Sequence, residues 1–325
     1  MLSRVAERLY WMARYTERAE NTARMIMSFQ NLALDMPKTE ALSWRGLVSV
    51  TGMEAIFDEH YQRDDERNCI KFLIADGYNP SSIFSALGAA RENVRTTRDQ
   101  IPSEAWEVMN ELFLYARGNL DVGISKRGRY GFLSEIVRRC QMLTGLLSGC
   151  MSHDSGYDFI RVGRNLERAD MTTRQIEIGA TRLLEQTDGA QPYDGLLWTS
   201  VLRSQSAFQM YRQHVRRRVS GVEVVRYLLQ DLPFPRSVAH ALCAVSEAIG
   251  ALPHNKESLR MATQAQRHTL NANVDELIRE HSLHAFMDQL QQEIGAIHFA
   301  IADAWFPRVE PHSNAPASQS ASQDN

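Results

Sequence analysis

A row of arginine and glutamate side chains near the N-terminus has the residue types and the spacing needed to bind a charged group. Arg14, Glu17, Arg18 and Asn21 are spaced i, i+3, i+4 and i+7, so on a helix they share one face. Arginine can fork onto a carboxylate or phosphate, and glutamate can position the arginine or bind an amine. This row therefore predicts either a groove for an anionic or zwitterionic ligand or a buried network of ion pairs.

The same row returns half a chain later. Residues 160–176, IRVGRNLERADMTTRQI, match residues 10–26, YWMARYTERAENTARMI, at a shift of 150 positions. A solvated helix face with weak pairs would not need the same order of charges twice, so we expect the two rows to lie close together inside one molecule. The predicted Glu–Arg centre consists of Arg14, Glu17, Arg18, Asn21, Arg24, Arg164, Glu167, Arg168 and Arg174.

Catalysis by these residues would need a further condition. Glu17 or Glu167 could act as a general acid or base only if burial shifted its protonation. We find no nucleophile–base pair, dinucleotide-binding fingerprint or cysteine motif that would name a reaction. Catalytic residues therefore stay unassigned, and no cofactor is predicted.

Two other segments carry polar residues at suggestive spacings. Glu280, His281, His284 and Asp288 could place two imidazoles and carboxylates on neighbouring turns, but their order is not that of a zinc protease, and the first half has no similar cluster. We interpret them as a polar helix face and predict no metal site. Residues 118–131 hold four glycines among basic residues without the ending of a phosphate-binding loop, and they predict a surface connector.

Long helices must position these residues. Apolar side chains follow one side of residues 2–34 at helical spacing, which predicts an amphipathic helix ending before Pro37. This apolar side consists of Val5, Leu9, Met12, Ala19, Ala23, Met27 and Leu34. Further helical patterns cover 42–62, 66–75, 80–100, 103–117, 132–150, 156–186, 196–218, 221–230, 235–251, 255–270 and 274–304. No segment alternates like a strand, so an all-α fold is predicted.

A second match supports a duplication. Residues 72–87 align with 227–242 at a shift of 155, with Pro80 opposite Pro235. We therefore expect a helical bundle built from two duplicated halves, 1–150 and 151–310, that are related by a pseudo-two-fold axis. The polar segment 311–325 is expected to be a disordered tail.

Composition limits the class of protein. The chain has 325 residues, of which 44% are hydrophobic and 23% charged, and its net charge of −3 argues against a nucleic-acid-binding protein. The N-terminus lacks the uninterrupted apolar stretch of a signal peptide or a membrane span. The four cysteines form no CxxC pair and are expected to be reduced, buried thiols, which favours a cytoplasmic location.

The segments LSRVAERLYWMARYTERAENTARM and FIRVGRNLERADMTTR resemble the hallmark of the bacterial alpha-E family, an uncharacterised all-helical group with a Glu-Arg motif. Here that motif is Glu17-Arg18 and Glu167-Arg168, and LLQDLPFPRSV at 228–238 resembles the second half of the family. The likeness extends to about residue 310. It implies a genetic association with circularly permuted ATP-grasp proteins, transglutaminase-like proteins and sometimes proteasome-like peptidases, and so a system that makes or trims amide-linked peptides.

Three hypotheses follow from the residues and the resemblance. The first is a non-enzymatic helical partner of an ATP-grasp amide ligase, which presents a peptide or stabilises the ligase and shows a broad exposed apolar patch. The second is an enzyme that binds a peptide or aminoacyl group and promotes amide formation, with the charged rows around an open pocket. The third is a scaffold, in which both glutamates are buried and fully paired with arginine.

Overall fold

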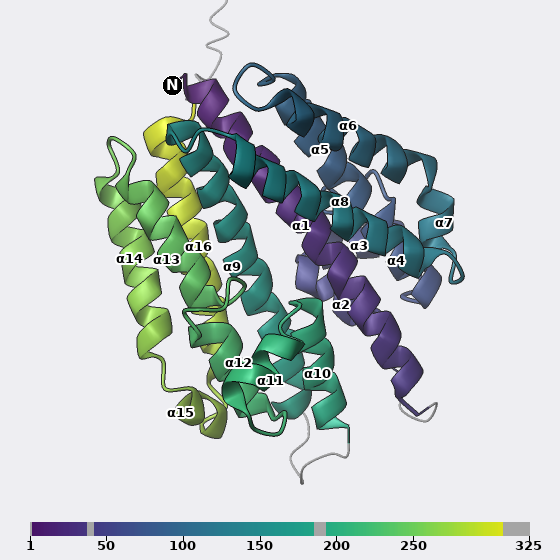
Figure 1. The fold of residues 1–325 in the computed structure, drawn as a ribbon. Helices are drawn as coiled ribbons and strands as arrows, with labels where there is room; N and C mark the ends of the chain where they lie inside the picture. Colours follow the sequence, from purple (N-terminus) through teal and green to yellow (C-terminus); the bar gives the residue numbers. More distant parts are fainter. Residues whose placement is uncertain (1, 38–41, 185–192, 308–325) are drawn as a thin grey trace, which may run out of the picture.

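The computed structural model describes residues 2–37, 42–184 and 193–307, with the backbone alone for 180–184. Within these ranges the chain forms sixteen helices and no strand, which confirms the predicted all-α fold (Figure 1). The first eight helices are α1 (Ser3–Asp35), α2 (Arg45–Thr51), α3 (Glu54–His60), α4 (Glu66–Ile74), α5 (Ile83–Arg95), α6 (Ser103–Gly118), α7 (Leu120–Ile124) and α8 (Arg129–Cys150). The others are α9 (Ser155–Leu184), α10 (Asp194–Ser204), α11 (Phe208–Val215), α12 (Gly221–Gln230), α13 (Val238–Gly250), α14 (Lys256–Asn271), α15 (Val274–Arg279) and α16 (Leu283–Trp305).

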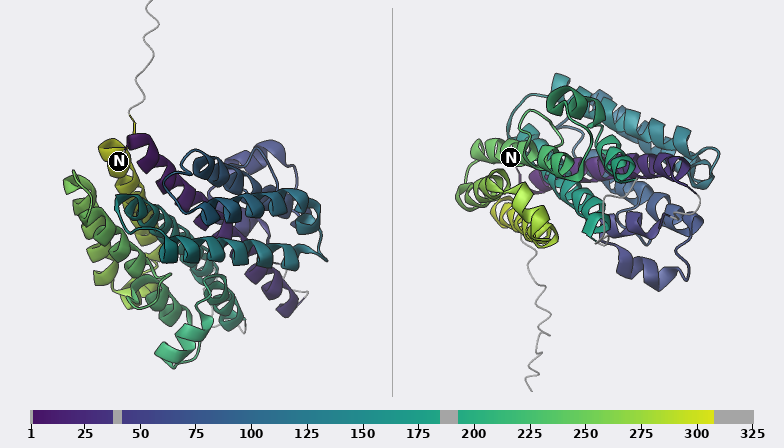
Figure 2. Two further views of the ribbon diagram at one scale, coloured as in Figure 1. Left: turned by 45° about the horizontal axis from the view of Figure 1, so that its top comes forward. Right: turned by 90° about the horizontal axis from the view of Figure 1, so that it is seen from below.

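The two longest helices, α1 and α9, pack against each other at the centre of the molecule. Helix α1 also contacts α5, α8 and α10, and α9 also contacts α13 and α16. Most of the first set of helices lies on one side of α1, and α11 to α16 lie on the other side around α9 (Figures 1 and 2). The approach is close, because a Cβ atom added to Gly163 of α9 would lie 2.3 Å from the carbonyl oxygen of Tyr10 on α1.

Helix α1 contributes to two apolar cores. Leu9 and Met12 pack in the core that includes α9 and most of the second half, whereas Ala23 and Ile26 pack in the core that includes α2 to α8. Glu17 lies between these two stretches of α1 and is buried as well. The junction of the two cores is therefore polar.

Side-chain caps fix the start of several shorter helices. The side chain of Asp65 accepts from the backbone of Asn68 at α4, and Ser237 accepts from the backbone N–H of His240 at α13, at 3.1 Å. A capping oxygen satisfies a backbone N–H that has no partner within the helix. These caps fix the residues at which α4 and α13 begin.

The structure corrects several predicted boundaries. The helix expected at 42–62 is broken at Gly52, whose positive φ of 66° ends α2. The connector expected at 118–131 contains α7, and the helix expected at 274–304 is broken before α16, where His281 has a φ of 54°. Leu34 was expected on the apolar side of α1 but is 78% exposed, because α1 extends beyond its neighbours there.

The remaining general predictions have mixed outcomes. Cys69 and Cys140 are buried as expected, but Cys150, at the end of α8, is exposed and Cys243 is only partly covered. No helix in the described ranges is both long and apolar enough to cross a membrane. The expected tail at 311–325 lies outside the described residues, and the division into two duplicated halves stays a prediction.

Candidate functional site

Two reciprocal ion pairs link the central helices. Arg18 of α1 donates to both carboxylate oxygens of Glu167 on α9, at 2.5 and 3.0 Å. Arg168 of α9 donates to both carboxylate oxygens of Glu17 on α1, at 3.1 and 2.8 Å. Paired N–H groups on two oxygens are the strong, directional form of this interaction. The two Glu-Arg dipeptides thus pair with each other.

Arg14 adds a third cation on the Glu167 side. Its Nε donates to Glu167 at 2.7 Å, and one terminal nitrogen donates to the hydroxyl of Tyr10 at 3.1 Å. That hydroxyl also lies 2.8 Å from Nδ1 of His298 on α16. A chain of hydrogen bonds through Arg14 and Tyr10 therefore connects the Glu167 carboxylate to His298 on α16.

Arg236 adds a further cation on the Glu17 side, and the sequence did not predict it. It lies in the turn between α12 and α13, and it donates to Glu17 at 2.9 Å, Asn21 at 2.7 Å and Glu20 at 2.7 Å. The backbone of the turn is held on α9, because the hydroxyl of Thr172 donates to the carbonyl of Arg236 at 3.2 Å. The sequence offers one signal for Arg236: it is a cation directly after the apolar, proline-rich segment LPFP.

The other predicted residues lie around this centre. Asn21 donates to Glu17 at 3.2 Å, and Arg24 donates to Glu20 at 2.8 Å. Arg174 donates to Asp170 at 3.1 Å, at the edge of the network. Arg164 lies near Glu17, but its Nε is buried and has no hydrogen-bond partner within the described residues. The structure therefore brings most of the predicted residues together, with Arg164 and Arg174 at the periphery.

Burial and charge act in opposite directions on the two glutamates. Glu17 is 2% exposed and Glu167 is 1% exposed. Burial raises the pKa of the Glu17 carboxyl, but the charges of Arg168 and Arg236 outweigh it and lower that pKa to about 2. For Glu167, the charges of Arg18 and Arg14 outweigh burial in the same way and lower the pKa to about 2. Both carboxylates are therefore ionised at neutral pH.

This arrangement limits the chemistry that the glutamates can perform. A general acid or base works best when its pKa lies near the working pH. Carboxylates with a pKa of about 2 are poor bases and hold no proton to donate at neutral pH. The same carboxylate oxygens are already engaged by arginine. The geometry is that of a buried ion-pair network, and the alternative of a solvated helix face is wrong for α1.

Aromatic side chains cover the arginines of α1. The guanidinium carbon of Arg14 lies 5.3 Å from the centre of the Trp11 ring, and that of Arg18 lies 5.5 Å from the centre of the Tyr15 ring. Cations over aromatic faces are stabilised by the ring quadrupole. The aromatic rings cover part of the two guanidinium groups, although the Arg18 side chain is still 19% exposed.

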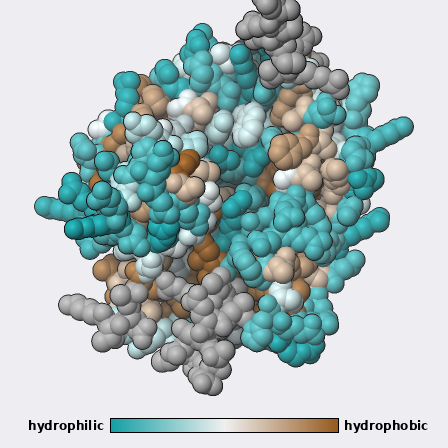
Figure 3. Space-filling view, turned by 180° about the vertical axis from the view of Figure 1, so that it is seen from behind, coloured by the Kyte–Doolittle hydropathy of each residue, from teal (hydrophilic) through white to brown (hydrophobic). Residues whose placement is uncertain are grey.

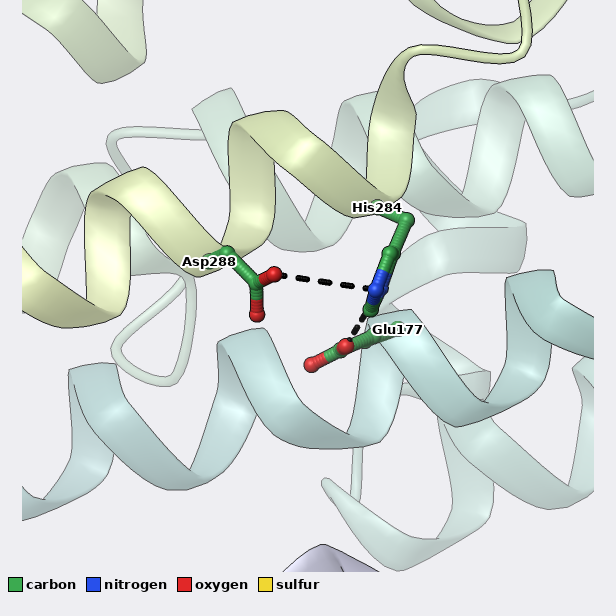
Figure 4. Close-up of side chains that lie close together, drawn as sticks. All are labelled: Glu177, His284 and Asp288. Atoms are coloured by element: carbon green, nitrogen blue, oxygen red, sulfur yellow. Dashed lines mark ion pairs between the residues drawn. The ribbon is translucent and has the colours of Figure 1, made fainter.

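The histidine cluster near the C-terminus joins α16 to α9. Nδ1 of His284 lies 2.6 Å from Glu177 of α9, and its Nε2 lies 3.6 Å from Asp288 (Figure 4). Glu177 also accepts from Gln291 at 2.8 Å. One ligand atom from each of Glu177, His284 and Asp288 lies within 4.8 Å of the others, which is close enough for a shared metal ion, so the absence of a metal site stays a prediction. His281 lies in the turn before α16, so the two histidines do not follow one continuous helix.

Comparison with known proteins gives a family and distant relatives. The model of the Alpha-E family, described as a predicted alpha-helical domain with a conserved ER motif, matches residues 1–306. Uncharacterised proteins of Mycobacterium bovis and of Mycobacterium tuberculosis are 22% identical over 321 residues, which cover 92% of this chain and 36% of each relative. The chain thus spans about a third of the length of these relatives. No solved structure matches it.

Proposed function

The chain belongs to the Alpha-E family, and from that premise we propose that it is a non-catalytic helical partner protein of an ATP-grasp-type amide ligase. Its Glu–Arg centre has a structural role in this proposal. The centre holds α1, α9 and the turn before α13 in one arrangement, so that the outer helices present a fixed surface to the ligase. The system would act on peptides in the cytoplasm.

The observation that carries the structural, non-catalytic part of this proposal is the complete pairing of the two buried glutamates, which is the arrangement expected of the scaffold hypothesis. Each carboxylate accepts from two arginines, and at least one of these comes from the other central helix. An enzyme that used Glu17 or Glu167 would need an open carboxylate with a pKa near neutrality, whereas the pKa of both is about 2. A buried pair of this kind serves to fix one arrangement of the helices.

One further observation supports a partner role, and another limits the kind of contact it could use. The relatives in Mycobacterium are longer than this chain, which fits a helical domain that works together with additional protein. One face of the molecule is mostly hydrophilic, with apolar residues in small separate patches (Figure 3). This face therefore lacks the broad exposed apolar patch that we expected of a partner protein, and only a polar, reversible contact would fit it.

The proposal is tested by reconstitution with a circularly permuted ATP-grasp protein of the kind that the family resemblance implies. We expect the two proteins to co-elute in size-exclusion chromatography. We also expect the chain to change the rate of ATP hydrolysis or the mass of the amide product that the ligase forms. The chain alone should release no ADP from ATP. An intact ligase whose hydrolysis and products are the same with and without the chain would overturn the partner role.

A variant separates the structural centre from a catalytic one. Glu167→Gln should lower the thermal stability of the chain. At a temperature where the variant is still folded, it should keep its effect on the ligase. Loss of that effect by a fully folded Glu167→Gln protein would instead favour an enzymatic role for the centre.

A further inference from the structure

A cavity of about 230 Å³ lies beside the Glu–Arg centre, between α1, α9 and the turns that follow α2 and precede α5. Its volume is below the range of about 300–1,000 Å³ that is typical of drug-sized ligands, so it fits a small group. Six polar or charged residues of the two central helices line it: Arg14, Arg18, Thr22, Glu167, Asp170 and Arg174.

The charges that line the cavity do not cancel. Three arginines face two carboxylates, so the lining carries one excess positive charge. Glu167 is held by Arg14 and Arg18, and Asp170 is held by Arg174 at 3.1 Å. The side chains of Arg18 and Arg174 are 19% and 29% exposed, so solvent and solutes reach them. An anion that entered the cavity would neutralise the excess charge.

An unsatisfied hydroxyl gives a second, independent indication. Thr22 lines the cavity, its side-chain oxygen is buried, and that oxygen has no hydrogen-bond partner within the described residues. A buried hydroxyl without a partner is costly, and a bound oxygen atom would relieve that cost. Its sequence match in the second half, Thr172, does have a partner, the carbonyl of Arg236.

The two sides of the centre differ in what fills this space. At the shift that pairs Pro80 with Pro235, Ser81 takes the place of Arg236. The side chain of Arg236 fills the space beside Glu17, whereas the shorter Ser81 lines the open cavity beside Glu167. The cavity beside Glu167 thus corresponds to the space beside Glu17 that the Arg236 side chain fills.

We propose that this cavity binds the carboxylate group of a small ligand. Arg18 and Arg174 would provide the charge, and the hydroxyl of Thr22 would donate to a carboxylate oxygen. A single negative charge matches the one excess positive charge, whereas a phosphate dianion would leave the site negative. The site does not depend on an amide ligase as partner.

Calorimetric titration of the full chain tests this site with defined probes. N-acetylglycine carries the carboxylate, and N-acetylglycinamide is its uncharged counterpart of nearly the same shape. We expect saturable binding of the acid and none of the amide at the same concentration. Equal binding of acid and amide, or binding of neither, would overturn the proposal. Inorganic phosphate that binds more tightly than N-acetylglycine would overturn the choice of a carboxylate.

A matched pair of variants locates the binding. Arg174→Gln removes a cation from the cavity and should weaken the binding of N-acetylglycine roughly ten-fold, as expected for one charge-assisted contact. Arg24→Gln removes the sequence match of Arg174, which pairs with Glu20 instead, and should change that affinity by less than about two-fold. Thermal unfolding of both variants shows that they are folded. Equal weakening by both variants would contradict the assigned cavity.

Discussion

Arg168 donates two hydrogen bonds, of 3.1 and 2.8 Å, to the two carboxylate oxygens of Glu17 across the contact between α9 and α1. Arg18 and Glu167 make the same contact in the opposite direction. Because each helix supplies one acid and one base, neither can slide or rotate without breaking both pairs. The centre therefore fixes the relative position of the two helices that carry the rest of the fold.

Removing one of the central carboxylates should destabilise the protein strongly. Glu17→Gln leaves Arg168 without its buried counter-charge and Arg236 with Glu20 alone, and we expect the free energy of unfolding to fall by about 3–5 kcal/mol. Urea titration followed by circular dichroism measures this loss. The control is Glu92→Gln, which removes an exposed pair with Arg95 and should cost less than about 1 kcal/mol. Similar stability of the two variants would mean that the centre is not structural.

Stability should fall in acid through the two central carboxylates. Their pKa of about 2 in the folded protein lies below the ordinary value of 4.5, so the unfolded chain binds protons more readily. The contribution is fully present above about pH 4.5 and is lost as the pH falls towards 2, on the order of 3 kcal/mol for each group. Urea midpoints between pH 6 and 2 measure it. Glu167→Gln should flatten this dependence, and an unchanged slope would contradict the assignment.

His298 should stay neutral well below the ordinary pKa of histidine. Burial, together with the positive charge of Arg14, lowers its pKa from 6.5 to about 4. The unfolded chain then binds the proton first, so stability declines as the pH falls from about 6.5 towards 4. Nuclear magnetic resonance of the imidazole signals measures the pKa directly. A midpoint near 6.5 for His298 would show that it is not buried beside Arg14.

The two matched threonines should respond differently to the loss of their hydroxyl groups. Thr172→Val removes a hydrogen bond to the carbonyl of Arg236 and should cost about 1 kcal/mol of unfolding free energy. Thr22→Val removes a buried hydroxyl that has no partner within the described residues, so stability should be unchanged or higher. Chemical denaturation of both variants gives the comparison. A loss for Thr22→Val as large as that for Thr172→Val would show that its hydroxyl is satisfied in solution.

The central pairing was predictable because helical spacing is local. The i, i+3, i+4 order of Arg14, Glu17 and Arg18 places them on one face, and its return at Arg164, Glu167 and Arg168 indicated two faces that meet. The amphipathic pattern also gave the extent of α1, from Ser3 to Asp35, to within one residue. Whether the faces were buried could not be decided, since an exposed pair and a buried pair have the same spacing.

Arg236 was missed for a physical reason. Arg236 belongs to the turn between α12 and α13. The position of a side chain in a turn depends on how the flanking helices pack, and helical spacing in the sequence does not predict it. Arg164 was expected in the centre because it matches Arg14, which pairs with Glu167 in the structure. On the other side of the centre Arg236 takes that role and is the second arginine that pairs with Glu17. The break at His281 was missed because apolar residues at helical spacing lie on both sides of it and no glycine or proline marks the turn.

Gly163 determines how closely the two central helices approach. It lies one turn before Glu167 and directly against the backbone of Tyr10, which lies one turn before Arg14. An alanine at this position would act as a wedge, since its methyl group would occupy the volume of the Tyr10 carbonyl oxygen. The helix axes would separate, and the guanidinium groups of the next turn would lie too far from their carboxylates to keep both hydrogen bonds. The ion pairs between α1 and α9 thus depend on the missing side chain of Gly163, which lets the two helices approach closely.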